Sequence, residues 1–111
     1  MILRKCYILF LLASMASVSV AQKTDRDYLR SGNKLYKDSL FIKAEVDYRK
    51  ALEINPNFAQ AYHERGRVKL AKGDKQRSMG DMKKAIELAP ENGASINGEY
   101  NNFEQQKNIP F

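Results

Sequence analysis

The chain has 111 residues, 19 of them basic and 13 acidic, so its formal net charge is +6 and its length suits one small domain. One Cys, one His and no Trp leave too few thiol and imidazole groups for a zinc site, and only one histidine could act as a general base. We therefore expect no multidomain enzyme, no metal site and no cofactor.

The first 21 residues have the order of an export signal. Two basic residues precede an apolar run, Tyr7–Ala13, and small residues follow it. Ser19 and Ala21 stand at the two positions that a signal peptidase reads, which predicts a signal peptide over residues 1–21 and a mature start at Gln22. A retained membrane anchor is the alternative, although the uncharged run of 17 residues is short for a span of about 20.

Removal of this leader would change the chemistry of the chain. The remaining 90 residues carry 17 basic and 13 acidic side chains, a net charge of +4, and no Cys. We expect an exported protein of the cell envelope, either periplasmic or extracellular. Because no disulfide can form, packing or association must supply its stability.

A period of 34 residues organises the rest of the chain into two units, at about 25–58 and 59–92. Seven identical pairs stand 34 positions apart: Tyr28 and Tyr62, Gly32 and Gly66, Asp47 and Asp81, Lys50 and Lys84, Ala51 and Ala85, Glu53 and Glu87, Pro56 and Pro90. Such a period is the sequence signature of an array of small structural units.

The apolar spacing inside each copy is helical. The first copy places its apolar residues on one helix face, namely Phe41, Ala44, Tyr48, Ala51 and Leu52. The second copy has a similar stripe of Met79, Met82, Ala85, Ile86 and Leu88. We predict helices near 25–37, 41–54, 58–72 and 75–88.

Start and stop signals agree with these helices. Thr24 followed three residues later by Asp27 predicts a capping box. The pair Gly73 and Asp74 predicts the end of one helix and the cap of the next, and a proline closes each unit.

These units resemble the tetratricopeptide repeat (TPR), a helix-turn-helix unit of 34 residues that stacks into a right-handed superhelix. Small residues occupy the places where helices of that family press together: Gly32, Ala44, Ala51, Gly66, Ser78 and Ala85. The segment from Asp81 to Pro90 is similar to a typical second helix. The resemblance implies an all-α fold of two stacked units. Ser31 and Arg65 replace leucines of the family, which we expect to weaken packing of the first helices.

Residues 93–111 follow the second unit. Ala94, Ile96, Tyr100 and Phe103 have helix-compatible spacing. Since about three repeats are usually needed for a stable array, we predict a capping helix at about 94–107 that covers the open end. Ile109–Phe111 should form an irregular end.

The residues give little support to enzyme chemistry. His63 is the only histidine, no nucleophile motif surrounds it, and we interpret it as a polar residue on an exposed helix face. There is no phosphate-binding glycine loop and no calcium loop. Nucleic-acid binding is disfavoured as well, because the basic residues alternate with acidic ones.

In the resembling family, the first helix of each unit lines a concave groove. Mapped by the repeat, the groove side here holds Arg26, Leu29, Arg30, Asn33, Tyr36, Lys37, Gln60, His63, Glu64, Arg67, Leu70 and Ala71. Four permanent cations against one anion predict a groove for an extended acidic peptide or partner protein, with Leu29, Tyr36 and Leu70 as apolar contacts. The alternative is an ordinary solvated helix surface.

The sequence therefore predicts an exported, non-enzymatic protein–protein interaction module. Two alternatives stay open. Two repeats expose an unfinished edge, and the first alternative is therefore a structural protein that self-associates through it. An accessory subunit of an envelope complex would differ from the leading interpretation only in its partner.

Overall fold

The computed structural model describes residues 21–107; residues 1–20 of the predicted signal peptide and the predicted irregular end lie outside them. The described part is all-α, without strands. Its elements in chain order are α2 (Asp25–Lys37), α3 (Phe41–Ile54), α4 (Ala59–Ala71), α5 (Lys75–Leu88), the short 3₁₀ helix η1 (Pro90–Asn92) and α6 (Gly93–Lys107).

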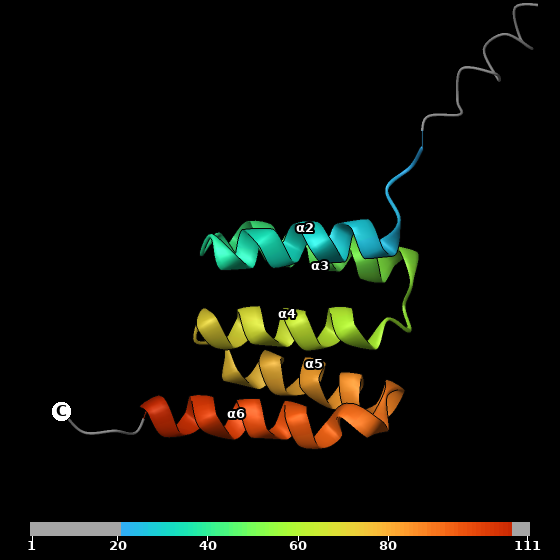
Figure 1. Ribbon diagram of the computed structural model, residues 1–111. Helices are drawn as coiled ribbons and strands as arrows, with labels where there is room; N and C mark the ends of the chain where they lie inside the picture. The colour runs from blue at the N-terminus through green and yellow to red at the C-terminus, as the bar shows by residue number, and fades with distance from the viewer. Residues whose placement is uncertain (1–20, 108–111) are drawn as a thin grey trace, which may run out of the picture.

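The helices form two antiparallel pairs and a terminal helix, as the sequence predicts. Figure 1 shows the pair α2 and α3 stacked on the pair α4 and α5, with α6 at the end of the stack. The predicted bounds differ by one residue at each end of α4 and at the start of α6. Phe58 and Lys72 cap α4 rather than belonging to it.

The predicted start and stop signals are confirmed. The Thr24 side chain accepts a hydrogen bond from the Asp27 amide at 3.2 Å, and the Asp27 carboxylate accepts one from the Thr24 amide at 2.9 Å. After α4 the chain turns at Gly73 with φ of +88°. Asp74 then caps α5 by accepting from the Arg77 amide at 3.2 Å.

The paired helices approach one another at the predicted small residues. A Cβ atom on Gly32 would lie 2.6 Å from the ring of Tyr48, which is fully buried. A Cβ on Gly66 would lie 3.0 Å from Met82. Glycine at these two positions is therefore required by the close contact of each first helix with its second helix.

Two apolar clusters hold the stack together. The first joins α2, α3 and α4 through Leu29, Ala44, Tyr48, Ala51, Leu52, Ala61 and Val68. The second joins α4, α5 and α6 through Leu70, Met82, Ala85 and Ile96. Because Ile96 is buried in this second cluster, α6 covers α5 as a terminal helix should.

Two residues that the sequence placed on apolar stripes lie elsewhere. Met79 is 54% exposed, because it occupies the repeat position of Glu45 rather than that of a buried residue. Ala94 is exposed as well, since α6 packs through Gly93, Ile96 and the partly buried Tyr100. The predicted stripe was wrong at both positions.

Candidate functional site

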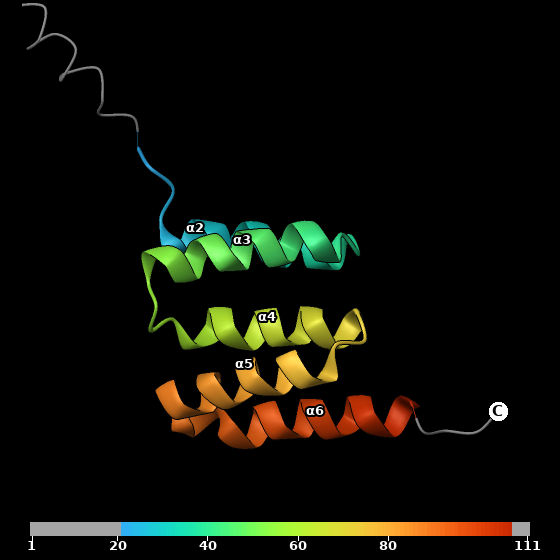
Figure 2. The same ribbon diagram turned by 180° about the vertical axis from the view of Figure 1, so that it is seen from behind.

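The first helices of the two units lie side by side on one face of the stack. In Figure 1, α2, α4 and α6 form the near layer, while α3 lies behind α2. Figure 2 shows α3 and α5 from the opposite side, where α3 stands in front of α2. The groove residues predicted on α2 and α4 therefore share the near face.

Five of the residues predicted on the groove side surround one hollow. Asn33, Tyr36 and Lys37 of α2 line a hollow of about 220 Å³ together with Glu64 and Arg67 of α4. The Arg67 guanidinium lies over the Tyr36 ring, 5.0 Å from its centroid. Arg67 also pairs with Glu64, at 3.0 Å between Nη1 and Oε2. We call this the Arg67 hollow.

Electrostatics keep the Arg67 hollow polar and cationic. Burial opposes the charge of Arg67, but the nearby Glu64, Tyr36 and Glu99 outweigh it and raise the pKa of Arg67. The floor contains a further fixed polar contact, because the Tyr48 hydroxyl donates to Asn33 Oδ1 at 2.7 Å. Burial, and then the Glu64 carboxylate, raise the pKa of Tyr48, so this hydroxyl stays protonated.

A second hollow lies between α4 and the end of the stack. It has a volume of about 250 Å³ and is lined by Ala59, Gln60, His63, Ala85, Ala89, Asn92, Ser95 and Ile96. Two predicted groove residues, Gln60 and His63, thus belong to this hollow rather than to the first.

Glu99 of α6 joins the two hollows. Its Oε2 atom lies 2.9 Å from His63 Nε2 and 3.5 Å from Arg67 Nε. Glu99 was not among the predicted site residues, and its repeat equivalents differ from it in role: Ser31 and Arg65 bond to Asp47 and Asp81 of their own second helices. The position of Ile96, three residues before Glu99, is the signal that could have placed this carboxylate beside α4.

The remaining predicted groove residues fall into two groups. Leu29 and Leu70 are only 6% and 3% exposed, so they are core residues and not accessible apolar contacts; that part of the prediction was wrong. Arg26 and Arg30 are exposed on α2. His63 is partly buried and paired with Glu99, which corrects its interpretation as an exposed polar residue.

Between residues 21 and 107, no three or more His, Cys, Asp or Glu side chains gather in a way that could hold a metal ion. None of the helices described there has the length and apolar character needed to cross a membrane.

Comparison with known proteins finds similarity to the tetratricopeptide repeat family over part of the chain. The model of the Tetratricopeptide repeat family matches residues 47–79, which run from α3 through α4 into α5. The chain is also similar to the Tetratricopeptide repeat protein 36 homolog of Nematostella vectensis, with 38% identity over 55 residues. That alignment covers 50% of this chain and 30% of the relative, so the chain matches less than a third of the relative's length.

Proposed function

We propose that this chain is an exported, non-enzymatic protein-binding module whose α2–α4 face holds an extended acidic segment of a partner protein. The observation that carries the proposal is the Arg67 hollow, where Lys37 and Arg67 stand beside the Tyr36 ring. Stacked helical repeats present extended surfaces of this kind to peptides.

The charges of this face favour a carboxylate-bearing ligand. Arg26, Arg30 and Lys37 are exposed on α2. Arg67 presents a planar donor group suited to carboxylates, and its side chain is 37% exposed. Glu99 already places one carboxylate against Arg67 and His63, so the chain itself contains an example of the contact that an acidic ligand would make.

The test is binding of a fluorescent hexaglutamate probe to the full chain, followed by fluorescence anisotropy. We expect saturable binding that weakens as salt increases, because long-range attraction between charges is screened. Hexaglutamine is the matched uncharged probe and should bind at least tenfold more weakly. Absence of hexaglutamate binding contradicts an acidic ligand.

Charge reversal locates the site. The double variant Arg30→Glu, Arg67→Glu should weaken hexaglutamate binding by more than tenfold while helicity is unchanged. The control variant Lys83→Glu, Lys84→Glu makes the same change in net charge on exposed positions of α5. Equal weakening by both variants would show attraction by net charge alone and would place the site elsewhere.

Glu99→Gln sharpens the same test. Removing this carboxylate frees Arg67 and His63 from an internal competitor, so affinity for hexaglutamate should rise severalfold. Unchanged affinity would mean that the ligand does not reach the end of the groove near α6.

Export is part of the proposal, and its support is the order of charged, apolar and small residues in 1–21. When the chain is expressed in a bacterium with two membranes, mass measurement of the protein outside the cytoplasm should show a start at Gln22. Ala21→Arg should block that cleavage. Full-length chain confined to the cytoplasm would contradict export.

Self-association through the end of the stack has less support than partner binding. The exposed positions of α6 include Ala94, Ser95, Asn97, Glu99, Asn101, Asn102 and Gln105, which are mostly polar. A polar outer face is what a capping helix of a repeat stack presents to water. Sedimentation of the chain as a concentration-independent monomer would agree with this assignment.

A further inference from the structure

The outward faces of α3 and α5 differ in the apolar residues that they expose at equivalent repeat positions. Positions 42, 46, 49, 50 and 53 share the outward face of α3, since they are four, seven, eight and eleven residues apart from the first. Ile42 is 72% exposed on this face and Val46 is 39% exposed. The repeat equivalents on α5 are Gln76 and Gly80.

Charge on these two faces is, by contrast, the same. The exposed charged residues of α3 are Lys43, Arg49, Lys50 and Glu53, and their equivalents on α5 are Arg77, Lys83, Lys84 and Glu87. Each outward face as defined above therefore carries two cations and one anion, and a third cation, Lys43 or Arg77, lies beside it. Both faces lie on the side of the stack seen in Figure 2, opposite the Arg67 hollow.

The apolar residues of α3 bring no evident gain in stability. Ile42 leaves 72% of its surface in water and Val46 leaves 39%, and α5 forms the same helix with Gln76 and Gly80 in their places. At the start of α3, Leu40 occupies the N-cap and makes no side-chain cap hydrogen bond, whereas Asp74 caps α5. At these two positions the first unit has isoleucine and valine where the second has glutamine and glycine, which points to an interaction surface on α3.

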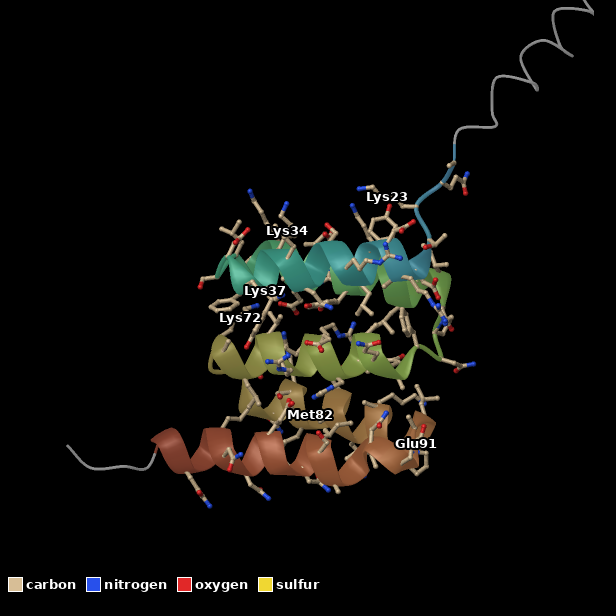
Figure 3. The ribbon with its side chains drawn as sticks, viewed as in Figure 1. Lys23, Lys34, Lys37, Lys72, Met82 and Glu91 are labelled. Carbon is tan, nitrogen blue, oxygen red and sulfur yellow. The ribbon has the colours of Figure 1, made fainter. Side chains whose placement is uncertain are left out.

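An apolar hollow continues this surface toward the end of the helices. It has a volume of about 610 Å³ and is lined by Ser39, Leu40, Phe41, Ile42, Lys43 and Lys72. Figure 3 shows Lys72 at the same end of the stack as Lys34 and Lys37. Lys72 pairs with Glu45 at 2.7 Å, so Lys43 is the cation beside these apolar walls for a molecule that has an apolar body and an anionic head.

We infer that the outward face of α3 docks on an anionic phospholipid bilayer, with Ile42 and Val46 entering the headgroup region and Lys43, Arg49 and Lys50 contacting lipid phosphates. A helix that exposes apolar residues among basic ones binds at such an interface. Each basic residue near the anionic surface strengthens the binding. The three cations of α5 extend the same attraction, and the Arg67 hollow stays free on the opposite side.

A bilayer fits this surface better than an acidic peptide does. The α3 residues project from the outside of the stack: Lys43 and Arg49 are exposed, and Lys50 lies over the Tyr28 ring, 5.6 Å from its centroid. Such a surface matches a plane of mobile anionic headgroups. A peptide, in contrast, needs a groove with polar groups that fix its orientation.

The experiment uses the full chain and vesicles that contain phosphatidylglycerol with a photoactivatable group in its acyl chain. After irradiation, proteolysis and mass spectrometry identify the segments that carry lipid. We expect lipid on the peptide that contains residues 41–54, counted per chain bound to the vesicles. Counting in this way separates docking of α3 from any binding through residues 1–21.

Three comparisons decide the result. The variant Ile42→Gln, Val46→Gln should lose at least tenfold of the α3 labelling, and Lys43→Gln, Arg49→Gln should lose about fivefold per removed charge. Met79→Gln removes an apolar residue of α5 whose exposure, 54%, lies between those of Ile42 and Val46, and it should leave the labelling unchanged. Circular dichroism should show the same helicity for all variants, because every change is at an exposed helix position.

The inference is overturned if α3 of the unaltered chain carries no lipid, or if Ile42→Gln, Val46→Gln is labelled as strongly as the unaltered chain. Equal labelling from vesicles of photoactivatable phosphatidylcholine alone would also overturn it, because charge would then have no part in docking. A face that serves an acidic protein instead would leave α3 unlabelled.

Discussion

The two helix pairs have the same backbone arrangement and different interiors. In the first pair, the Tyr48 ring fills the space beside Gly32, and its hydroxyl donates to Asn33. In the second pair, Met82 lies beside Gly66, and Asp81 is held by Arg65 and Lys69 at 2.7 Å each. The glycine positions thus leave little room for a side chain in either pair. The polar contacts beside them differ, since the first pair has a neutral hydrogen bond and the second has ion pairs.

The largest expected difference between the pairs concerns their aspartates. The Asp81 side chain is 8% exposed, and its loss leaves Arg65 and Lys69, 20% and 13% exposed, without their common partner. Asp81→Ala should lower the free energy of unfolding by about 3 kcal/mol. Asp47→Ala removes only the hydrogen bond from Ser31 and should cost about 1 kcal/mol.

Urea unfolding followed by circular dichroism measures both costs. Asp81→Asn is the control for side-chain size, because it keeps the shape and removes the charge; it should be nearly as costly as Asp81→Ala. Equal costs for the two aspartates would show that the ionic interior of the second pair is no more than a polar contact.

Glycine replacement gives the next largest effect. Gly32→Ala forces a methyl group to 2.6 Å from the rigid ring of Tyr48 and should cost about 2 kcal/mol. Gly66→Ala meets the flexible Met82 at 3.0 Å and should cost about half as much. Gly80→Ala, where nothing lies within 4 Å, should instead stabilise the helix by about 1 kcal/mol. Thermal unfolding of the three variants tests this order, and a stabilised Gly32→Ala protein would refute the close contact.

A smaller difference is expected at the starts of the second helices. Asp74→Ala removes the cap of α5 and should cost about 1 kcal/mol. Leu40→Asp gives α3 the cap that it lacks and should add about 0.5 kcal/mol. The midpoints of urea unfolding measure both changes, provided that the slope of the unfolding free energy against urea concentration stays the same. A destabilised Leu40→Asp protein would mean that Leu40 contributes more by packing than a cap would.

The smallest expected effect is a pH dependence of the stability of α2. The hydrogen bonds from the Thr24 amide and hydroxyl lower the pKa of Asp27 below its ordinary value. Asp27 therefore binds a proton more readily in the unfolded chain than in the folded one. Its contribution to folding stability is present above about pH 4 and is lost as pH falls through the folded-state pKa. NMR titration of Asp27 should show the lowered midpoint in the normal chain and an ordinary one in Thr24→Ala.

The sequence predicted most of the fold because the features that fix it are local. A capping pair, a turn glycine and apolar residues at helical spacing define each helix without knowledge of its neighbours. The polar residues were harder to interpret. Ser31 and Arg65 were expected to weaken packing, yet both bond to an aspartate of the second helix, which depends on a partner 16 positions away.

The candidate site was predictable only in part. The repeat placed Asn33, Tyr36, Lys37 and Arg67 on one face, and the structure gathers them around one hollow. The repeat pattern did not distinguish accessible residues from buried ones, so Leu29 and Leu70 were assigned to the surface. Glu99 lies beyond the two 34-residue units, and the buried Ile96 three residues before it was the available signal for its place beside α4.

The short connections between helices have a consequence for the rate of folding. Three residues join α2 to α3, four join α3 to α4, and three join α4 to α5. Closing such short loops costs little chain entropy. Proteins dominated by contacts this close in sequence fold within microseconds to milliseconds. The contacts within each pair form fast, whereas the first apolar cluster also takes Ala61 and Val68 from α4, so the first pair completes its core only when α4 packs against it.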